Sequence, residues 1–200
     1  MKVAFLHAKQ DPKYAVAMVA SVKRHMPGVE VLQLTDDTTT AIEGCTAVRL
    51  PWNGEEPMIL KMTHLSKLTG DILALDTDVI VQADVSGVFS LPFDVALTWR
   101  DGPIRGPKGE DITKLMPINC GVMFCRNPEF WQACIQLCMV HEIEHWCADQ
   151  LTVPHVAKRF NTLGLHCDTF NHTPNSKNED VSGRLIVHYK GDRKDWMLPL

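Results

Sequence analysis

Residues 72–83 read Ile-Leu-Ala-Leu-Asp-Thr-Asp-Val-Ile-Val-Gln-Ala, an apolar run interrupted by two carboxylates, Asp76 and Asp78. The apolar residues on both sides predict a strand buried on both faces. Because burying an unpaired carboxylate is costly, the pair is expected where the strand emerges at the edge of the sheet. Ligands of open α/β sheets bind at this carboxyl edge. Two closely spaced Asp side chains there suit a hard divalent cation, Mn²⁺ or Mg²⁺, of the kind that carries a diphosphate.

The segment that precedes this run alternates between strand and helix patterns. Residues 3–6 form a short apolar run that predicts a first strand. Residues 11–25, which open with an aspartate and a proline, predict a helix that the following Pro-Gly pair ends. Residues 29–34 alternate as a second strand. Strand, helix and strand in this order form a βαβ unit, which implies a parallel sheet.

The rest of the chain continues this alternation. Further strands are predicted at 48–50, 94–99, 118–125 and 184–187, and further helices at 57–70, 127–147 and 149–160. Residues 101–117 form a loop rich in glycine, proline and charge, and loops of this length are often functional lids. Residues 171–182 form a second polar loop. The sequence therefore predicts one α/β domain over residues 1–200.

Composition excludes several classes of protein. The chain has 200 residues, 45% of them hydrophobic and 22% charged, which is ordinary for a globular protein. A net charge of −4 gives no sign of a basic nucleic-acid surface. The N-terminal apolar run is too short for a signal peptide, and no segment approaches the ~20 apolar residues that cross a bilayer. We therefore expect a cytoplasmic protein that does not span a membrane.

The seven cysteines are an odd number scattered through apolar segments. A disulfide framework is not expected in a chain of this size and composition, so reduced thiols in a reducing compartment are predicted. The sequence contains no C-x-x-C pair, which argues against a zinc site built on cysteine.

A cluster of polar residues follows the last predicted strand. His188 stands directly after that strand, and Lys190, Gly191, Arg193 and Lys194 follow it. An imidazole beside a glycine turn and three cations can complete a metal site and hold the phosphates of an anionic ligand. A frayed basic C-terminus is the alternative.

Two motifs suggest other chemistries. The spacing in residues 76–78 also matches the nucleophile motif of HAD-like phosphatases, which usually carry it on the first strand, whereas here a complete βαβ unit precedes it. Residues 141–145 match the zinc-hydrolase pattern H-E-x-x-H on a predicted helix. Glu144, however, puts a charge where such helices carry an uncharged residue, and the longer metzincin pattern is missing. A solvated helix face with two histidines is the simpler interpretation.

Taken in order, four motifs resemble those of the GT-A glycosyltransferases, particularly the family 8 type that includes glycogenin and bacterial galactosyl- and glucosyltransferases. The resemblance extends over about residues 3–196 and is carried by the D-x-D of Asp76-Thr77-Asp78, the N-x-G of Asn119-Cys120-Gly121, the pair Asp149-Gln150, and the H-x-x-G-x-x-K of residues 188–194. It implies a GT-A fold and a nucleotide-sugar donor, with UDP-sugar as the expected donor.

The resemblance also implies roles for individual residues. Asp76, Asp78 and His188 are expected to hold Mn²⁺ or Mg²⁺ against the donor diphosphate. The other donor contacts implied are Gly191 and Lys194 at the phosphates, Lys61 at a phosphate or the donor sugar, and His7, Ala8, Tyr14 and Asp36 around the base and ribose. Thr77 and Lys190 are further residues expected to bind the donor. The residues implied to face the donor sugar and acceptor are Asn119, Asp149 and Gln150. Family 8 members retain the anomeric configuration, so retention is implied as well.

Two alternatives share this fold. A sugar-phosphate nucleotidyltransferase would carry a glycine-rich loop after its first strand, but residues 7–12 contain no glycine. A non-catalytic nucleotide-sugar binding module would keep the donor site without an acceptor site, and this chain is short for the family. The sequence leaves the acceptor open among a saccharide, a protein, a lipid and a modified nucleobase.

Overall fold

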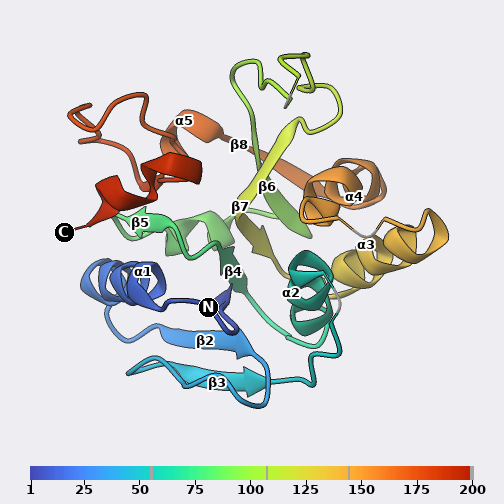
Figure 1. The fold of residues 1–200 in the computed structure, drawn as a ribbon, viewed down its shortest axis with the longest axis horizontal. Helices are drawn as coiled ribbons and strands as arrows, with labels where there is room; N and C mark the ends of the chain where they lie inside the picture. The colour runs from blue at the N-terminus through green and yellow to red at the C-terminus, as the bar shows by residue number, and fades with distance from the viewer. Residues whose placement is uncertain (55, 107, 144, 199–200) are drawn as a thin grey trace.

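A seven-stranded sheet forms the centre of the computed structural model, which describes residues 1–54, 56–106, 108–143 and 145–198. Its strands are β1 (Lys2–Leu6), β2 (Glu30–Thr35), β3 (Thr46–Arg49), β4 (Ile72–Leu75), β6 (Val95–Trp99), β7 (Ile118–Cys125) and β8 (Thr162–His166). They lie in the order β3-β2-β1-β4-β7-β6-β8 (Figure 1). β7 is antiparallel to both of its neighbours, and the other pairings are parallel. The predicted α/β fold with a mostly parallel sheet is confirmed.

Helices cover both faces of this sheet. α2 (Pro57–Leu65), α3 (Glu129–Val140) and α4 (Ala148–Val156) pack on one face, and α1 (Lys13–His25) packs on the other (Figure 1). The short helices are η1 (Ser86–Ser90), η2 (Ala157–Arg159), α5 (Cys167–Phe170) and η3 (Gly191–Met197). Successive side chains of a strand point to opposite faces, so Val3 and Phe5 join the core under α1 while Ala4 joins the core under α2.

The run 72–83 does not form the single strand that was predicted. β4 ends at Leu75, residues 76–78 turn out of the sheet, and β5 (Val79–Val81) pairs with β9 (Ile186–His188) in a separate two-stranded sheet. The two carboxylates therefore leave the buried ladder at the carboxyl end of β4, as predicted. Because β5 pairs with β9 in antiparallel register, Val79 lies opposite His188, and the C-terminal segment is brought to the D-x-D turn.

The predicted helix over 127–147 is too long. α3 ends at Val140, and Glu142 adopts a left-handed φ of 51°, which a continuing helix does not permit. The described residues of the H-E-x-x-H motif, 141–143 and 145, therefore lie outside a helix. Glu144 of that motif lies outside the described residues.

Other boundaries differ from the predictions. α2 ends at Leu65, five residues before the predicted glycine stop, and the helix predicted over 149–160 is divided into α4 and η2. β8 and α5 were not predicted. The pattern of β8 is weak because this edge strand is only partly buried and contains Gly164.

Two absences can be stated for the described part of the chain. No helix within it is long and apolar enough to cross a membrane. All seven cysteines are free thiols in this structure.

Candidate functional site

A cavity of about 600 Å³ opens at the carboxyl edge of the central sheet, where the ends of several strands meet. Its walls come from the D-x-D turn after β4, the beginning of β7, the first turn of α4 and the residues that follow β9. Loop residues Ile104, Arg105, Ile112 and Met116 close one side. The long loop over 101–117 therefore contributes directly to this cavity.

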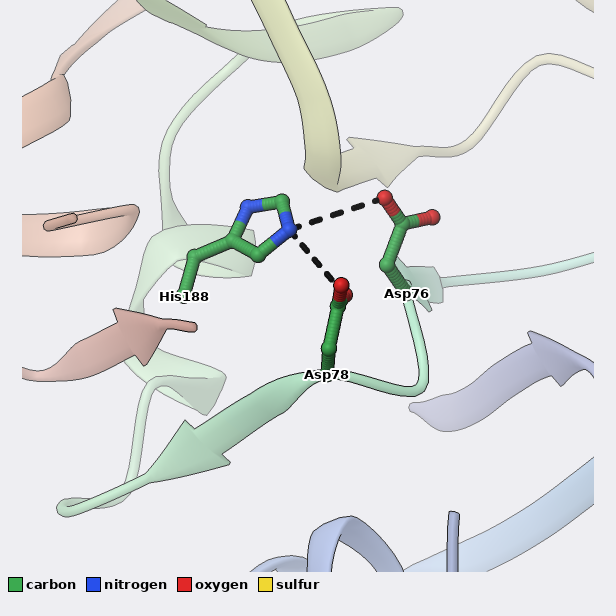
Figure 2. Close-up of side chains that lie close together, drawn as sticks. All are labelled: Asp76, Asp78 and His188. Carbon is green, nitrogen blue, oxygen red and sulfur yellow. Dashed lines mark ion pairs between the residues drawn. The ribbon is translucent and has the colours of Figure 1, made fainter. Parts of the chain in front are cut away.

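Asp76, Asp78 and His188 converge in this cavity (Figure 2). One ligand atom from each lies within 4.8 Å of the others. His188 Nε2 is 3.1 Å from Asp78 Oδ1 and 3.9 Å from Asp76 Oδ2. Asp78 and His188 are buried, whereas the Asp76 side chain is 33% exposed. Carboxylate oxygens with one imidazole nitrogen form a donor set that Mn²⁺ accepts and whose oxygens suit Mg²⁺, so these residues fit a divalent ion.

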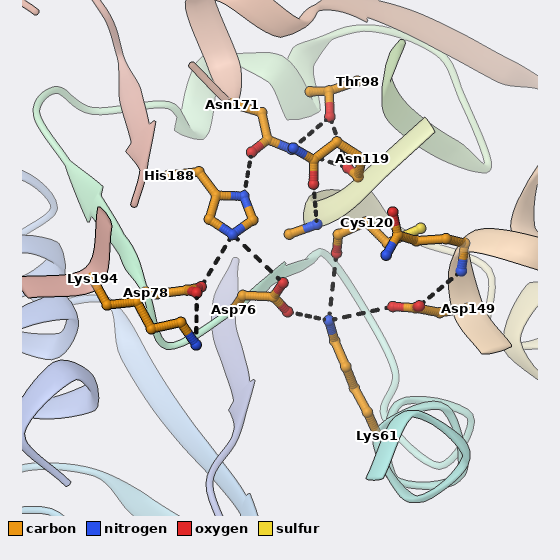
Figure 3. A network of polar contacts seen from close by, with 12 residues as sticks. Lys61, Asp76, Asp78, Thr98, Asn119, Cys120, Asp149, Asn171, His188 and Lys194 are labelled. Carbon is orange, nitrogen blue, oxygen red and sulfur yellow. Dashed lines mark hydrogen bonds and ion pairs between the residues drawn. The ribbon is translucent and has the colours of Figure 1, made fainter. Parts of the chain in front are cut away.

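Asn171 fixes the orientation of His188. Its Oδ1 lies 2.9 Å from His188 Nδ1, and its Nδ2 donates to Thr98 Oγ1 at 2.8 Å and to the carbonyl oxygen of Asn119 at 2.9 Å (Figure 3). An amide oxygen only accepts, so Nδ1 carries a hydrogen, and Nε2 is the ring nitrogen that faces the two carboxylates and could bind an ion beside them. Asn171 is fully buried and opens a polar segment with no pattern that marks it, which is why sequence reasoning missed it.

Gly121 leaves room for the same imidazole. A Cβ at this position would lie 2.2 Å from His188 Cε1 and 3.1 Å from Asp76 Oδ2. Any other residue would displace one of the two side chains. The glycine of the N-x-G motif thus allows the close approach of the imidazole to β7.

Lys194 completes the surroundings of Asp78. Its Nζ lies 3.0 Å from Asp78 Oδ2, because η3 folds the C-terminal segment back over the cavity. Burial by itself would raise the pKa of Asp78, but His188 and Lys194 outweigh it and hold that pKa below its usual range. Asp78 therefore stays ionised at neutral pH. The segment after His188 is ordered as a 3₁₀ helix, which corrects the alternative of a frayed terminus.

Lys61 bridges the D-x-D turn and α4 from a fully buried position (Figure 3). Its Nζ lies 2.7 Å from Asp76 Oδ1 and 3.9 Å from Asp149 Oδ2. Burial lowers the pKa of Lys61, but the two carboxylates raise it further, so the side chain remains a cation. Burial raises the pKa of Asp149 to about 6. The positive charge of Lys61 lowers this pKa but does not offset burial, because Lys61 lies closer to Asp76 than to Asp149.

Asn119 and Gln150 also face the cavity. Asn119 Oδ1 accepts a hydrogen bond from the Gly121 amide at 3.2 Å, while its buried Nδ2 has no partner among the described residues. Gln150 Oε1 accepts a hydrogen bond from Arg100 at 2.5 Å. Asn119 therefore keeps one amide hydrogen-bond donor for a ligand.

The residues predicted to contact the nucleotide-sugar donor are only partly brought together. Ala8, Thr77, Lys190 and Gly191 line the cavity, but His7, Tyr14 and Asp36 do not. The Tyr14 hydroxyl donates to Asp195 at 2.6 Å, which ties α1 to η3. Asp36 Oδ1 accepts a hydrogen bond from the Thr39 amide at 2.7 Å, and the His7 side chain is buried.

Comparisons with known proteins identify the fold. Neither a family model nor a curated protein matches this chain. Among solved structures, the glycosyltransferase GlyE of Streptococcus pneumoniae superposes with a TM-score of 0.66 at 17% identity, over 98% of this chain and 56% of GlyE. A glycosyltransferase involved in glycosylation of the major capsid of PBCV-1 superposes with a TM-score of 0.66 at 16% identity, over 98% of each chain. The chain has the GT-A fold.

A further neighbour agrees with this fold. The galactosyltransferase LgtC, solved in complex with donor and acceptor sugar analogues, superposes with a TM-score of 0.63 at 12% identity, over 96% of this chain and 88% of LgtC. The chain spans about half the length of GlyE, of which it covers 56%. It spans nearly the whole of the PBCV-1 enzyme, of which it covers 98%.

Proposed function

We propose that this chain is a metal-dependent glycosyltransferase that transfers a sugar from a nucleotide-diphosphate sugar, with UDP-sugar as the donor. One observation carries the proposal: Asp76, Asp78 and His188 converge within 4.8 Å at the ligand-binding edge of a GT-A fold. The family 8 resemblance of the four motifs supports UDP as the nucleotide and retention of the anomeric configuration.

The metal side of the cavity would hold the leaving group. Asp76, Asp78 and His188 are the proposed ligands of Mn²⁺ or Mg²⁺, which would neutralise charge on the departing nucleoside diphosphate. Lys194 lies beside these ligands and supplies a further positive charge to the phosphates. Gly191 has a positive φ of 65° and exposes the backbone next to that lysine, and Thr77 stands between the two acids of the turn.

The opposite walls would hold the nucleoside and the sugar. Ala8 lines the cavity at the end of β1, and we assign His7, Tyr14 and Asp36 to the nucleoside side as residues that support that wall. The sugar-facing groups proposed are the free Nδ2 of Asn119, the buried pair of Lys61 and Asp149, and Gln150. The free thiols of the chain support the cytoplasm as the compartment of the reaction.

Thermal unfolding with nucleotides tests this function. We expect UDP to raise the unfolding temperature in the presence of Mn²⁺, more than GDP or ADP does, and not in the presence of a chelator. Asp78→Ala should remove the shift, whereas Glu142→Gln, which changes the motif on the turn after α3, should keep it. If no nucleoside diphosphate stabilises the protein in Mn²⁺, the transferase proposal fails.

Two further assays separate the alternatives. Slow, Mn²⁺-dependent release of UDP from UDP-glucose distinguishes an enzyme from a binding module. Hydrolysis of p-nitrophenyl phosphate without any nucleotide effect would favour the HAD-like phosphatase. The anomeric configuration of the product, followed by proton NMR, decides between retention and inversion.

A further inference from the structure

Three cations on one side of the cavity are not neutralised by the protein. Arg100, Lys190 and Arg193 all line the cavity. None of them forms an ion pair with a carboxylate in the described ranges, whereas Lys61 and Lys194 both do. Like charges that lie close together in a partly desolvated cavity repel one another. An anionic ligand would relieve this repulsion, because the described residues provide no carboxylate there.

The two arginines are nevertheless held in place by neutral groups. Arg100 donates from Nε to the carbonyl oxygen of Met116 at 2.9 Å and from Nη2 to Gln150. Arg193 donates from Nε to the carbonyl oxygen of Pro174 at 2.7 Å. These hydrogen bonds orient both guanidinium groups without cancelling their charge. The side chain of Lys190 lines the cavity, and within the described part of the chain its ammonium forms no hydrogen bond or ion pair with a protein side chain, so it can meet a ligand.

The cluster lies away from the proposed nucleoside position. Arg100 directly follows β6, and β6 is the third strand from β1 in the order β1-β4-β7-β6. At about 4.8 Å per strand, the carboxyl ends of β1 and β6 are about 14 Å apart. The proposed nucleoside lies near β1 and the diphosphate at the turn after β4, where Lys194 already pairs with Asp78. Arg100 therefore lies beyond the diphosphate, on the side away from the proposed nucleoside position. Lys190 and Arg193 follow β9, and Lys190 lies close enough to interact electrostatically with Arg100, Arg193 and Asp78, so the three cations extend from Arg100 toward the metal side.

Apolar side chains next to the cluster suit a saccharide. Ile104, Ile112 and Met116 line the same part of the cavity, and Trp146, which is 65% exposed, also lines it. An exposed indole and aliphatic side chains offer the flat apolar contacts that sugar rings use, while guanidinium groups bind carboxylate or phosphate in a bidentate manner. Together they favour an anion that is carried on a sugar.

We propose that Arg100, Lys190 and Arg193 form a second anion subsite that binds a carboxylate or phosphate on one of the two sugars of the reaction, either the transferred sugar or the acceptor. The proposal rests on the proposed function for the identity of those sugars. It assigns Lys190 to an anion on a sugar, whereas the sequence grouped Lys190 with the cations after His188 that could hold phosphates.

Binding measurements on matched neutral and anionic sugars test this subsite. Methyl β-glucoside and methyl β-glucuronide are titrated into the full chain, with and without Mg²⁺ and UDP, and followed by chemical shifts in ¹H–¹⁵N spectra. UDP-glucose and UDP-glucuronate are compared in Mg²⁺ by calorimetry. We expect the anionic member of one pair to bind at least ~10-fold more tightly, as one or two charge-assisted hydrogen bonds provide. The pair that shows the preference tells whether the acceptor or the transferred sugar carries the charge.

Variants assign the preference to these residues. Arg100→Gln and Lys190→Gln should each reduce it to about twofold, since a neutral amide replaces the charge. Lys108→Gln is the matched control, because Lys108 is exposed on the loop over 101–117 that follows Arg100 and does not line the cavity. Thermal unfolding checks that each variant folds.

Three results would overturn the subsite: equal binding within both pairs, a preference that survives both substitutions, or a loss of UDP affinity in both variants as large as the loss of preference. The last result would return the cations to the donor diphosphate. If UDP fails to bind the unaltered protein in Mg²⁺ while methyl glucuronide still binds in an Arg100- and Lys190-dependent way, the proposed function fails and the subsite stands.

Discussion

The two sides of the cavity differ in how their charges are matched. On the metal side, Asp78 is 6% exposed and contacts both His188 and Lys194, and Asn171 holds His188 in one orientation. On the sugar side, Arg100 and Lys190 have no described carboxylate partner. The side chains on the metal side are thus held in position by the protein itself before any ligand binds. Such a preorganised site suits the diphosphate, which is common to all nucleotide-sugar donors. On the sugar side, the positive charges of Arg100 and Lys190 can be neutralised only by a negatively charged ligand. This arrangement suits a site that selects an anionic substrate over a neutral one.

Asp78→Ala should have the largest effect, because it removes one of the three proposed metal ligands and leaves His188 and Lys194 without their partner. We expect the affinity for UDP in Mn²⁺ to fall more than ~100-fold by calorimetry. Asp84→Asn is the control, since Asp84 accepts a hydrogen bond from Ser86 and lies outside the cavity. Equal losses of UDP affinity in the two variants would show that Asp78 has no specific role in binding the metal and the nucleotide.

Gly121→Ala should lower Mn²⁺ affinity about 100-fold, because the new Cβ would overlap the His188 ring and displace a ligand. Gly102→Ala is the matched control: no atom lies within 4 Å of the corresponding Cβ. Titration of free Mn²⁺ by electron paramagnetic resonance measures both. Unchanged affinity in Gly121→Ala would mean that the imidazole does not bind the ion.

Asn171→Leu should lower Mn²⁺ affinity about 10-fold, because His188 loses the acceptor that keeps its hydrogen on Nδ1. The ¹⁵N shifts of the imidazole should change from a single tautomer to a mixture, a result that a general loss of stability would not produce. Asn171→Asp keeps the acceptor and should restore most of the affinity. If the tautomer is unchanged in Asn171→Leu, the positioning role is wrong.

His64 provides a comparison with His188, because both imidazoles are buried but neither nitrogen of His64 has a partner in the described residues. Burial lowers the pKa of His64 from 6.5 to about 4. The unfolded state therefore binds the proton more readily, and the stability conferred by neutral His64 is present above pH 6.5 and is lost as pH falls toward 4.

Between pH 7 and 5.5 this loss should amount to about 1 kcal/mol in urea unfolding. His64→Leu should remove that part of the pH dependence, whereas His155→Leu, at an exposed position on α4, should leave it in place. The same slope in all three proteins would refute the assignment to His64.

Arg100→Gln should have the smallest effect on the metal side. UDP affinity in Mn²⁺ is expected to stay within about twofold of the unaltered protein, because Arg100 contacts Met116 and Gln150 and none of the proposed metal ligands. Calorimetry with UDP measures it. A loss comparable to that of Asp78→Ala would erase the difference between the two sides of the cavity.

The elements that the sequence predicts well are those with strong local patterns. The βαβ unit at the N-terminus and the emergence of Asp76 and Asp78 at a strand end agree with the structure, and His188 lies beside the two acids with which it was grouped. Buried strands and helix-start signals are encoded by neighbouring residues, so they can be read without tertiary information.

The features that the sequence does not predict depend on tertiary contacts. Asn171 looks like an ordinary loop residue until the fold places it between His188 and Thr98. The length of α3 is overestimated because apolar periodicity continues past Val140, while the backbone turns at Glu142. The unneutralised state of Arg100 is likewise invisible in a sequence, since it depends on which acids the fold leaves out of reach.

The central claim is that Asp76, Asp78 and His188 hold a divalent ion against the diphosphate of a nucleotide-sugar. Electron spin-echo measurements on Mn²⁺ bound to the protein test it directly. We expect one histidine ¹⁴N coupling that disappears in His188→Gln, and ³¹P couplings that appear when UDP is added. A ¹⁴N coupling that persists in His188→Gln, or UDP that binds without any ³¹P coupling to the ion, would contradict the account.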